Sequence, residues 1–228
     1  MLLPELQYGA LLPYASHGFS AEAKRSKDIM LVLKRDGFVQ DPPILMSQWV
    51  AQTIQQNRNM LAFDSFFRPN TILVPTSKSS LMREGTLWVP HRLAIALVNC
   101  GLGKEVAQIL KRVRPVSKAA WSSPEKRPLP HEHYESMEVQ KSLSEPSNIL
   151  LIDDIITRGS TLLGAASRLA EVFPSAHICA FAVMRAITNE CDFEKVYYPI
   201  VGQSISEQRE ILCDGRNDLL AYRKTTYS

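Results

Sequence analysis

The sequence predicts an α/β fold in which a central parallel sheet of about five strands is flanked by helices. Short apolar segments that suit buried strands alternate along the chain with segments whose apolar residues recur at helical spacing. The clearest strand is the apolar run at residues 149–152, and a helix follows it with Leu162, Leu163, Ala166 and Leu169 on one face. The chain has 228 residues, which suffices for one such domain with a small appendage.

The other elements follow from the same signals. Residues 8–14 predict a turn-rich start, and Ser20 suits the N-cap of a first helix that Gly37 would end. The basic residues of that helix favour a solvated face over a binding patch. In order, we expect helices over residues 20–37, 44–57 and 90–99, and further strands over residues 71–75, 106–110 and 176–184.

Composition sets the class of protein. The hydrophobic content of 45% and charged content of 21% are ordinary for a globular chain, and the net charge of +3 is too small to indicate DNA binding alone. No apolar run approaches the roughly 20 residues that cross a bilayer, and residues 1–5 do not resemble a signal peptide. The four cysteines, Cys100, Cys179, Cys191 and Cys213, show no metal-ligand spacing. These features predict a cytoplasmic protein with reduced thiols and no membrane partner.

The segment after residues 149–152 carries the chemistry. Asp153 and Asp154 stand at the carboxyl end of this strand, where open α/β sheets place their ligands. Thr157, Ser160 and Thr161 then lead into a helix whose N-terminus suits one phosphate group. Carboxylates beside a phosphate site suggest a phosphorylated sugar, because carboxylates accept hydrogen bonds from vicinal hydroxyls. The alternative is that the two acids only cap the helix.

This segment resembles the ribose-phosphate signature of the type I phosphoribosyltransferases. The sequence Leu-Ile-Asp-Asp-Ile-Ile-Thr-Arg-Gly-Ser-Thr, at residues 151–161, matches the family pattern except at Arg158, where a second threonine is usual. The resemblance implies a type I phosphoribosyltransferase-like fold with a small variable hood, and 5-phosphoribosyl 1-diphosphate (PRPP) or a nucleotide as ligand. Asp153 and Asp154 would hold the ribose hydroxyls. The 5-phosphate would be bound by the residues that follow them, Ile155, Ile156, Thr157, Arg158, Gly159, Ser160 and Thr161.

The resemblance also implies transfer of the phosphoribosyl group to a small nitrogenous base with release of pyrophosphate. Mg²⁺ would be bound mainly through the substrate. The loop after the strand at residues 71–75 corresponds to the family's pyrophosphate loop, and it offers Thr76, Ser77 and Lys78. From the residues alone, an ordinary solvated loop is equally compatible with this segment.

Residues 111–147 form a long stretch without periodicity, where the resembled family has a loop that closes over the active site. The basic residues and histidines available there to meet the diphosphate are Arg112, Arg114, Lys118, Lys126, Arg127, His131 and His133. A disordered insert with scattered charge is the alternative.

The whole chain, residues 1–228, is predicted to be a single phosphoribosyltransferase-like domain. Residues 1–60 would form an N-terminal helical or hood segment, residues 70–186 the core, and residues 187–228 a C-terminal hood or tail. Dimers are common in the resembled family, so the resemblance is compatible with a homodimer, although the sequence does not settle the oligomeric state.

Two short segments resemble the ComF-type members of this family, which are associated with DNA uptake. They are residues 33–37 and residues 110–114, together with Lys118 and Arg127. Cysteines of a zinc ribbon do not precede them, and Lys118 stands where glutamine is common. Two alternatives to an enzyme therefore stay open: a regulator that senses PRPP or a nucleotide without turnover, and an accessory protein that meets nucleic acid or DNA-processing proteins.

Overall fold

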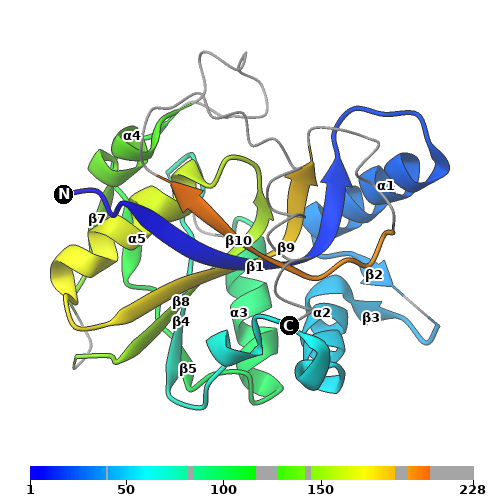
Figure 1. Ribbon diagram of the computed structural model, residues 1–228, viewed down its shortest axis with the longest axis horizontal. Helices are drawn as coiled ribbons and strands as arrows, with labels where there is room; N and C mark the ends of the chain where they lie inside the picture. The colour runs from blue at the N-terminus through cyan, green and yellow to red at the C-terminus, as the bar shows by residue number, and fades with distance from the viewer. Residues whose placement is uncertain (40, 82–84, 117–127, 142–144, 188–194, 206–228) are drawn as a thin grey trace, which may run out of the picture.

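The structure is a computed structural model that describes residues 1–39, 41–81, 85–116, 128–141, 145–187 and 195–205 (Figure 1). The strands are β1 (Glu5–Ala15), β2 (Phe38–Val39), β3 (Ile44–Leu45), β4 (Thr71–Pro75), β5 (Glu105–Val106), β6 (Leu110–Arg112), β7 (Met137–Val139), β8 (Asn148–Ile156), β9 (His177–Ile187) and β10 (Ile200–Ile205). The helices are α1 (Ala21–Arg35), α2 (Met46–Gln56), α3 (Val89–Asn99), α4 (Pro130–Glu135) and α5 (Ser160–Val172), with single 3₁₀ turns at Arg58–Met60 and Asp64–Phe66.

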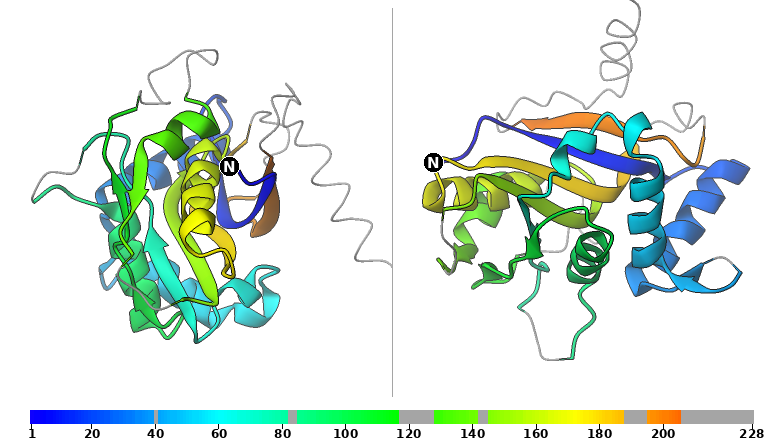
Figure 2. Two further views of the ribbon diagram at one scale, coloured as in Figure 1. Left: turned by 90° about the vertical axis from the view of Figure 1, so that its left-hand side faces the viewer. Right: turned by 90° about the horizontal axis from the view of Figure 1, so that it is seen from below.

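The central sheet has six strands in the order β10-β1-β9-β8-β4-β5. The five strands from β1 to β5 in this order run parallel, and β10 pairs with β1 in the antiparallel sense at the edge of the sheet. Both views of Figure 2 place β10 beside β1. The predicted α/β class with flanking helices is confirmed, and the sheet is mixed because of the antiparallel edge strand.

Two sequence predictions about strands are wrong. The expected turn-rich start at residues 8–14 is part of β1, which lies inside the sheet between β10 and β9. Gly9 suggested a turn, but its role is close packing, since a Cβ there would lie 2.6 Å from the ring of Phe63. The single strand expected at residues 106–110 is two short strands, of which β5 pairs with β4 and β6 pairs with β7.

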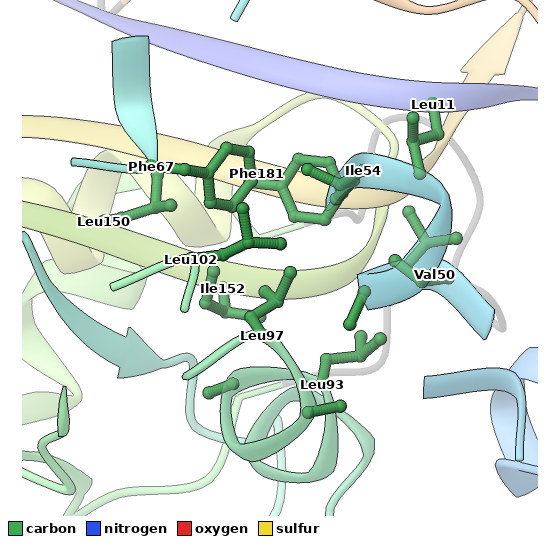
Figure 3. Close-up of a cluster of buried hydrophobic side chains, with 14 of the residues drawn as sticks. Leu11, Val50, Ile54, Phe67, Leu93, Leu97, Leu102, Leu150, Ile152 and Phe181 are labelled. Atoms are coloured by element: carbon green, nitrogen blue, oxygen red, sulfur yellow. The ribbon is translucent and has the colours of Figure 1, made fainter. Parts of the chain in front are cut away.

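Helices cover both faces of the sheet. Along β8, Leu150 and Ile152 point into a core that α2 and α3 close, whereas Ile149 and Leu151 point into a second core that α5 closes. This alternation follows from the two-residue period of a strand, and it makes β8 apolar on both faces. Figure 3 shows the first of these cores. Its side chains include Val50 and Ile54 of α2, Leu93 and Leu97 of α3, and Phe67, Leu102 and Phe181.

The first helix begins as predicted and ends one residue early. Ser20 is the N-cap of α1, and its hydroxyl accepts a hydrogen bond of 3.1 Å from the backbone N–H of Ala23. At the other end Asp36, not Gly37, takes the left-handed conformation, with φ of 46°. The buried carboxylate of Asp36 accepts a hydrogen bond of 2.8 Å from the backbone N–H of Ser47, which ties the end of α1 to α2.

Within the described part of the chain, none of the helices combines the length and apolar character that crossing a membrane requires.

Candidate functional site

The strand order of the sheet reverses between β4 and β8, so a ligand-binding crevice is expected at the carboxyl ends of these two strands. These strands are neighbours in the sheet, but the chain leaves β4 through α3 toward β5 and leaves β8 through α5 toward β9, in opposite directions. The two helices therefore lie on opposite faces of the sheet. Open α/β sheets bind their ligands at such a reversal of strand order.

The hydrogen-bond ladder between the two strands also ends here. β4 and β8 pair from Thr71 opposite Asn148 to Pro75 opposite Ile152, and one further bond joins the N–H of Thr76 to the carbonyl of Ile152. Beyond this point β8 continues only along β9, as far as Ile156. The strand is thus longer than the predicted apolar run, and the two aspartates lie in the part of β8 that extends beyond the end of β4.

Asp153 and Asp154 have different partners. One carboxylate oxygen of Asp153 accepts a hydrogen bond of 2.9 Å from the N–H of Asp154, and the Thr76 hydroxyl donates another to the same carboxylate. Asp154 forms an ion pair with Lys34 of α1, whose Nζ lies 2.8 Å from Oδ2. The N-cap of α5 is Gly159, which has no side chain to bond with, so the two acids do not act as helix caps.

The environment of Asp153 favours the neutral carboxyl group. Burial, and after it the adjacent charge of Asp154, raise its pKa from 3.8 to about 7. The positive charge of Lys34 and the hydrogen bonds from Asp154 and Thr76 act against this rise. A carboxyl group near the midpoint of its titration at neutral pH can both donate and accept hydrogen bonds to sugar hydroxyls.

The turn after β8 has the geometry of an anion site. Gly159 adopts φ of 75°, and α5 begins at the next residue, so the first N–H groups of this 13-residue helix have no partner within the helix. These N–H groups lie beside an open hollow that is lined by residues 155–162 together with Asp153, His133 and Pro128. Donors of this kind, at the positive end of a helix dipole, suit a phosphate group.

The structure brings the predicted phosphate-loop residues together in different roles. Thr157 and Arg158 are exposed, and Ser160 and Thr161 are half-buried at the hollow. Ile156 is buried in the core beneath α5, while Ile155 packs against the opposite core. These two isoleucines therefore offer backbone groups rather than side chains to a ligand.

Ser204 of β10 closes the loop from the far side. A Cβ at Gly159 would lie 2.0 Å from the Ser204 hydroxyl oxygen, so only glycine fits at this point of the loop.

The loop after β4 lies on the other side of the crevice. Thr76 is buried and turns its hydroxyl to Asp153, while Ser77 donates a hydrogen bond of 2.9 Å to the carbonyl of Leu110. The indole N–H of Trp88 donates to the carbonyl of Thr76 at 2.8 Å, which holds the start of the loop. Lys78 is half-buried next to these residues. The loop is therefore held in place by polar contacts at its first two residues.

Two buried basic groups lie beneath the two loops. Arg112 of β6 is only 3% exposed, and its guanidinium donates to the carbonyl of Lys78. It thus supports the backbone of the loop. Burial lowers the pKa of Arg112 to about 10, and Asp153 acts in the opposite direction. The neighbouring His133 of α4 is also buried. Lys118 and Arg127, two further residues predicted to meet the ligand, lie outside the described residues.

Lys34 is the site residue that sequence analysis missed. The basic residues of α1 were expected on a solvated face, and Lys34 is indeed 48% exposed, but its ammonium group reaches both carboxylate oxygens of Asp154. The two residues are 120 positions apart, so no local pattern signals the contact. The position of Lys34 within the ComF-like segment at residues 33–37 was its only sequence signal.

The oxygen atoms at this site would suit a magnesium ion only if a bound ligand supplied the rest of its coordination shell. Among the described residues, no group of three or more His, Cys, Asp or Glu side chains is arranged to hold a metal. Asp153 and Asp154 supply carboxylate oxygens, which Mg²⁺ prefers, but Lys34 already neutralises one of them. These residues fit an ion that reaches the site on a phosphorylated ligand.

Comparison with known proteins does not assign the chain to a family. The chain matches none of the protein-family models, and no curated protein matches its sequence.

Proposed function

We propose that this protein binds PRPP, or a nucleotide that contains ribose 5-phosphate, and transfers the phosphoribosyl group to a nitrogenous acceptor with release of pyrophosphate. One observation carries the proposal. The adjacent carboxylates of Asp153 and Asp154 lie beside an anion-binding helix N-terminus, at the point of the sheet where the strand order reverses. A phosphorylated pentose has the matching groups, a phosphate and vicinal hydroxyls, separated by a few bonds.

The two ends of such a ligand fit the two sides of the crevice. The N–H groups at the start of α5 and the hydroxyls of Ser160 and Thr161 would hold the 5-phosphate. Asp153 and Asp154 would accept hydrogen bonds from the ribose hydroxyls. The loop at residues 76–78, on the other side, would face the diphosphate, and Lys78 would offset its charge.

The proposed reaction is a displacement at C1 of the ribose. The lone pair of the acceptor nitrogen forms a bond to C1 while the bond from C1 to the diphosphate oxygen breaks, and pyrophosphate leaves with the electron pair. Positive charge grows on the sugar ring during this exchange, and the carboxylate of Asp154, together with Asp153 when it is ionised, would stabilise it electrostatically. Fixing the sugar at both ends supplies the orientation that the reaction needs. Magnesium bound to the substrate would offset charge on the leaving group.

Calorimetric titration of PRPP with magnesium tests the binding step. Replacing Asp153 and Asp154 together with asparagine should weaken PRPP binding by about tenfold to a hundredfold, since each carboxylate contributes charge-assisted hydrogen bonds. Asp64→Asn is the matched control, because Asp64 also forms an ion pair, with Arg58 at 2.6 Å, but lies away from the crevice. Unchanged PRPP affinity in the double variant, with the fold intact, would refute the assignment of the site.

Pyrophosphate release, measured with a panel of purine and pyrimidine bases, tests the transfer step. Binding of PRPP without release would identify a sensor in place of an enzyme. Salt-sensitive binding of single-stranded DNA without PRPP binding would favour the accessory role in DNA processing.

A further inference from the structure

A chain of buried polar groups runs between the two loops of the crevice. It begins at the carbonyl of Lys78, which accepts a hydrogen bond from Nε of Arg112. Another guanidinium nitrogen of Arg112 lies 3.4 Å from Nδ1 of His133, and Nε2 of His133 lies 3.4 Å from the hydroxyl oxygen of Thr161. Arg112 and His133 are only 3% and 5% exposed. The chain ends on a residue that lines the anion hollow.

The chemistry of the groups sets the direction of each hydrogen bond. A guanidinium only donates, so Nδ1 of His133 must accept from Arg112. Burial and then the charge of Arg112 lower the pKa of His133 to about 4, so the imidazole is neutral near pH 7 and carries its one proton on Nε2. That proton is donated to the oxygen of Thr161. The hydrogen of the Thr161 hydroxyl is then left to point to another acceptor, and the hollow lies beside it.

Close packing of α4 on α5 fixes the spacing of the chain. A Cβ at Gly164, one turn after Thr161, would lie 2.7 Å from Cβ of His133 and 2.7 Å from the carbonyl of Pro130. The glycine therefore lets the two helices touch where His133 reaches Thr161. On the other side, Ser136 donates a hydrogen bond of 2.8 Å to the carbonyl of His133 and accepts one from Arg112. The imidazole ring of His133 is thus held in one orientation by Arg112 on one side and Thr161 on the other.

We propose that His133 is a positioning residue for phosphate binding: it accepts from Arg112, donates to Thr161, and so turns the Thr161 hydroxyl into a donor aimed at the phosphate of the ligand. This inference rests on the proposed function, because it names the support of the same phosphate site. It assigns to His133 a role through Thr161, in contrast to direct contact with the diphosphate.

Substitution of His133 by the two amides separates its two contacts. The oxygen of asparagine lies near the position of Nδ1, so His133→Asn keeps an acceptor for Arg112 but cannot reach Thr161. The amide of glutamine lies near the position of Nε2, so His133→Gln keeps a donor for Thr161. Thr161→Val removes the hydroxyl and keeps the shape of the side chain.

Calorimetry with ribose 5-phosphate and magnesium gives the readout. Thr161→Val should weaken binding by about tenfold, the loss typical of one hydrogen bond to a charged group. His133→Asn should weaken binding by about threefold to tenfold, and His133→Gln should restore most of the loss. The double variant His133→Asn with Thr161→Val should bind as Thr161→Val alone does, because His133 acts only through that hydroxyl.

Other outcomes separate the possible failures. If His133→Asn binds ribose 5-phosphate as tightly as the natural protein, or if the two losses simply multiply in the double variant, His133 is not a positioning residue, and the proposed function stands. If the natural protein itself does not bind ribose 5-phosphate, the proposed function fails and this inference fails with it. Thermal unfolding of each variant reports whether its fold is intact.

Discussion

Removing the charge of Asp153 should stabilise the protein at neutral and alkaline pH, although the residue belongs to the proposed site. The substitution Asp153→Asn keeps the shape of the side chain and an oxygen that can accept from the N–H of Asp154. It removes a carboxylate whose pKa burial and the neighbouring Asp154 raise to about 7. The ionised form is therefore less stable in the folded chain than in the unfolded chain.

The sign and size of the effect follow from this pKa. Between its ordinary value of 3.8 and about 7, the folded protein binds the proton and the unfolded protein does not, so the free energy of unfolding falls as pH rises through this window. One pKa unit corresponds to about 1.4 kcal/mol, so the stability that removing the charge of Asp153 can restore above pH 7 is at most about 4 kcal/mol. Asparagine also weakens the bond from Thr76 and leaves Lys34 with one charged partner fewer, so we expect a net gain of about 2 kcal/mol at pH 8.

Urea unfolding of the natural protein and of Asp153→Asn, followed at several pH values, measures this gain. The difference should be small at pH 4.5 and reach about 2 kcal/mol at pH 8. Asp36→Asn is the contrasting control. Asp36 is also withdrawn from solvent, but it accepts from Ser47 and pairs with Arg92 at 3.2 Å, so its loss should destabilise the protein by about 1–3 kcal/mol. A difference for Asp153→Asn that does not change with pH would refute the reasoning.

Three further perturbations follow from the same site and core. Gly159→Ala should lower the free energy of unfolding by about 2–3 kcal/mol, because a side chain is strained at φ of 75° and would meet Ser204. In a double-mutant cycle, Ser204→Ala should recover part of this loss. Lys34→Met should raise the pKa of Asp153 in a carbon-13 NMR titration, because the positive charge of Lys34 lowers it, and an unchanged titration would contradict the ion-pair geometry. The same substitution should change the free energy of unfolding by less than about 1 kcal/mol, because Lys34 is half exposed. Cys179 should react slowly with iodoacetamide in the folded protein at pH 8, because burial raises its thiol pKa from 9.0 to about 11 and so reduces the thiolate fraction about a hundredfold. Mass spectrometry measures the labelling, and rapid labelling would disprove this burial.

Local patterns predicted the elements that carry the site. The apolar run before Asp153 and the helical spacing after Thr161 indicated β8 and α5, and the hydroxyl of Ser20 indicated the start of α1. In each case the signal lies within a few residues of the feature that it predicts. The acids, the glycine turn and the helix N-terminus fall within one continuous segment, so their proximity needs no knowledge of the rest of the fold.

Features that depend on distant contacts escaped prediction. Gly9 and Pro13 suggested turns, but β1 is stabilised by pairing with β9 and β10, more than 160 positions away. The ion pair of Lys34 with Asp154 and the contact of His133 with Thr161 likewise join separate elements. Local patterns in the sequence contain no signal for such contacts, because they arise only when the sheet is assembled.

The contact between Ser204 and Gly159 links the edge strand β10 to the turn that follows the central strand β8. Among the described strands β10 pairs only with β1, yet its Ser204 lies against Gly159, which lines the hollow. A shift of this outermost strand would change the shape of the turn through Ser204, which does not itself line the hollow. Variation in the last described strand could therefore adjust affinity from a distance, and related proteins could diverge in ligand preference by changing their borders while their central residues stay the same.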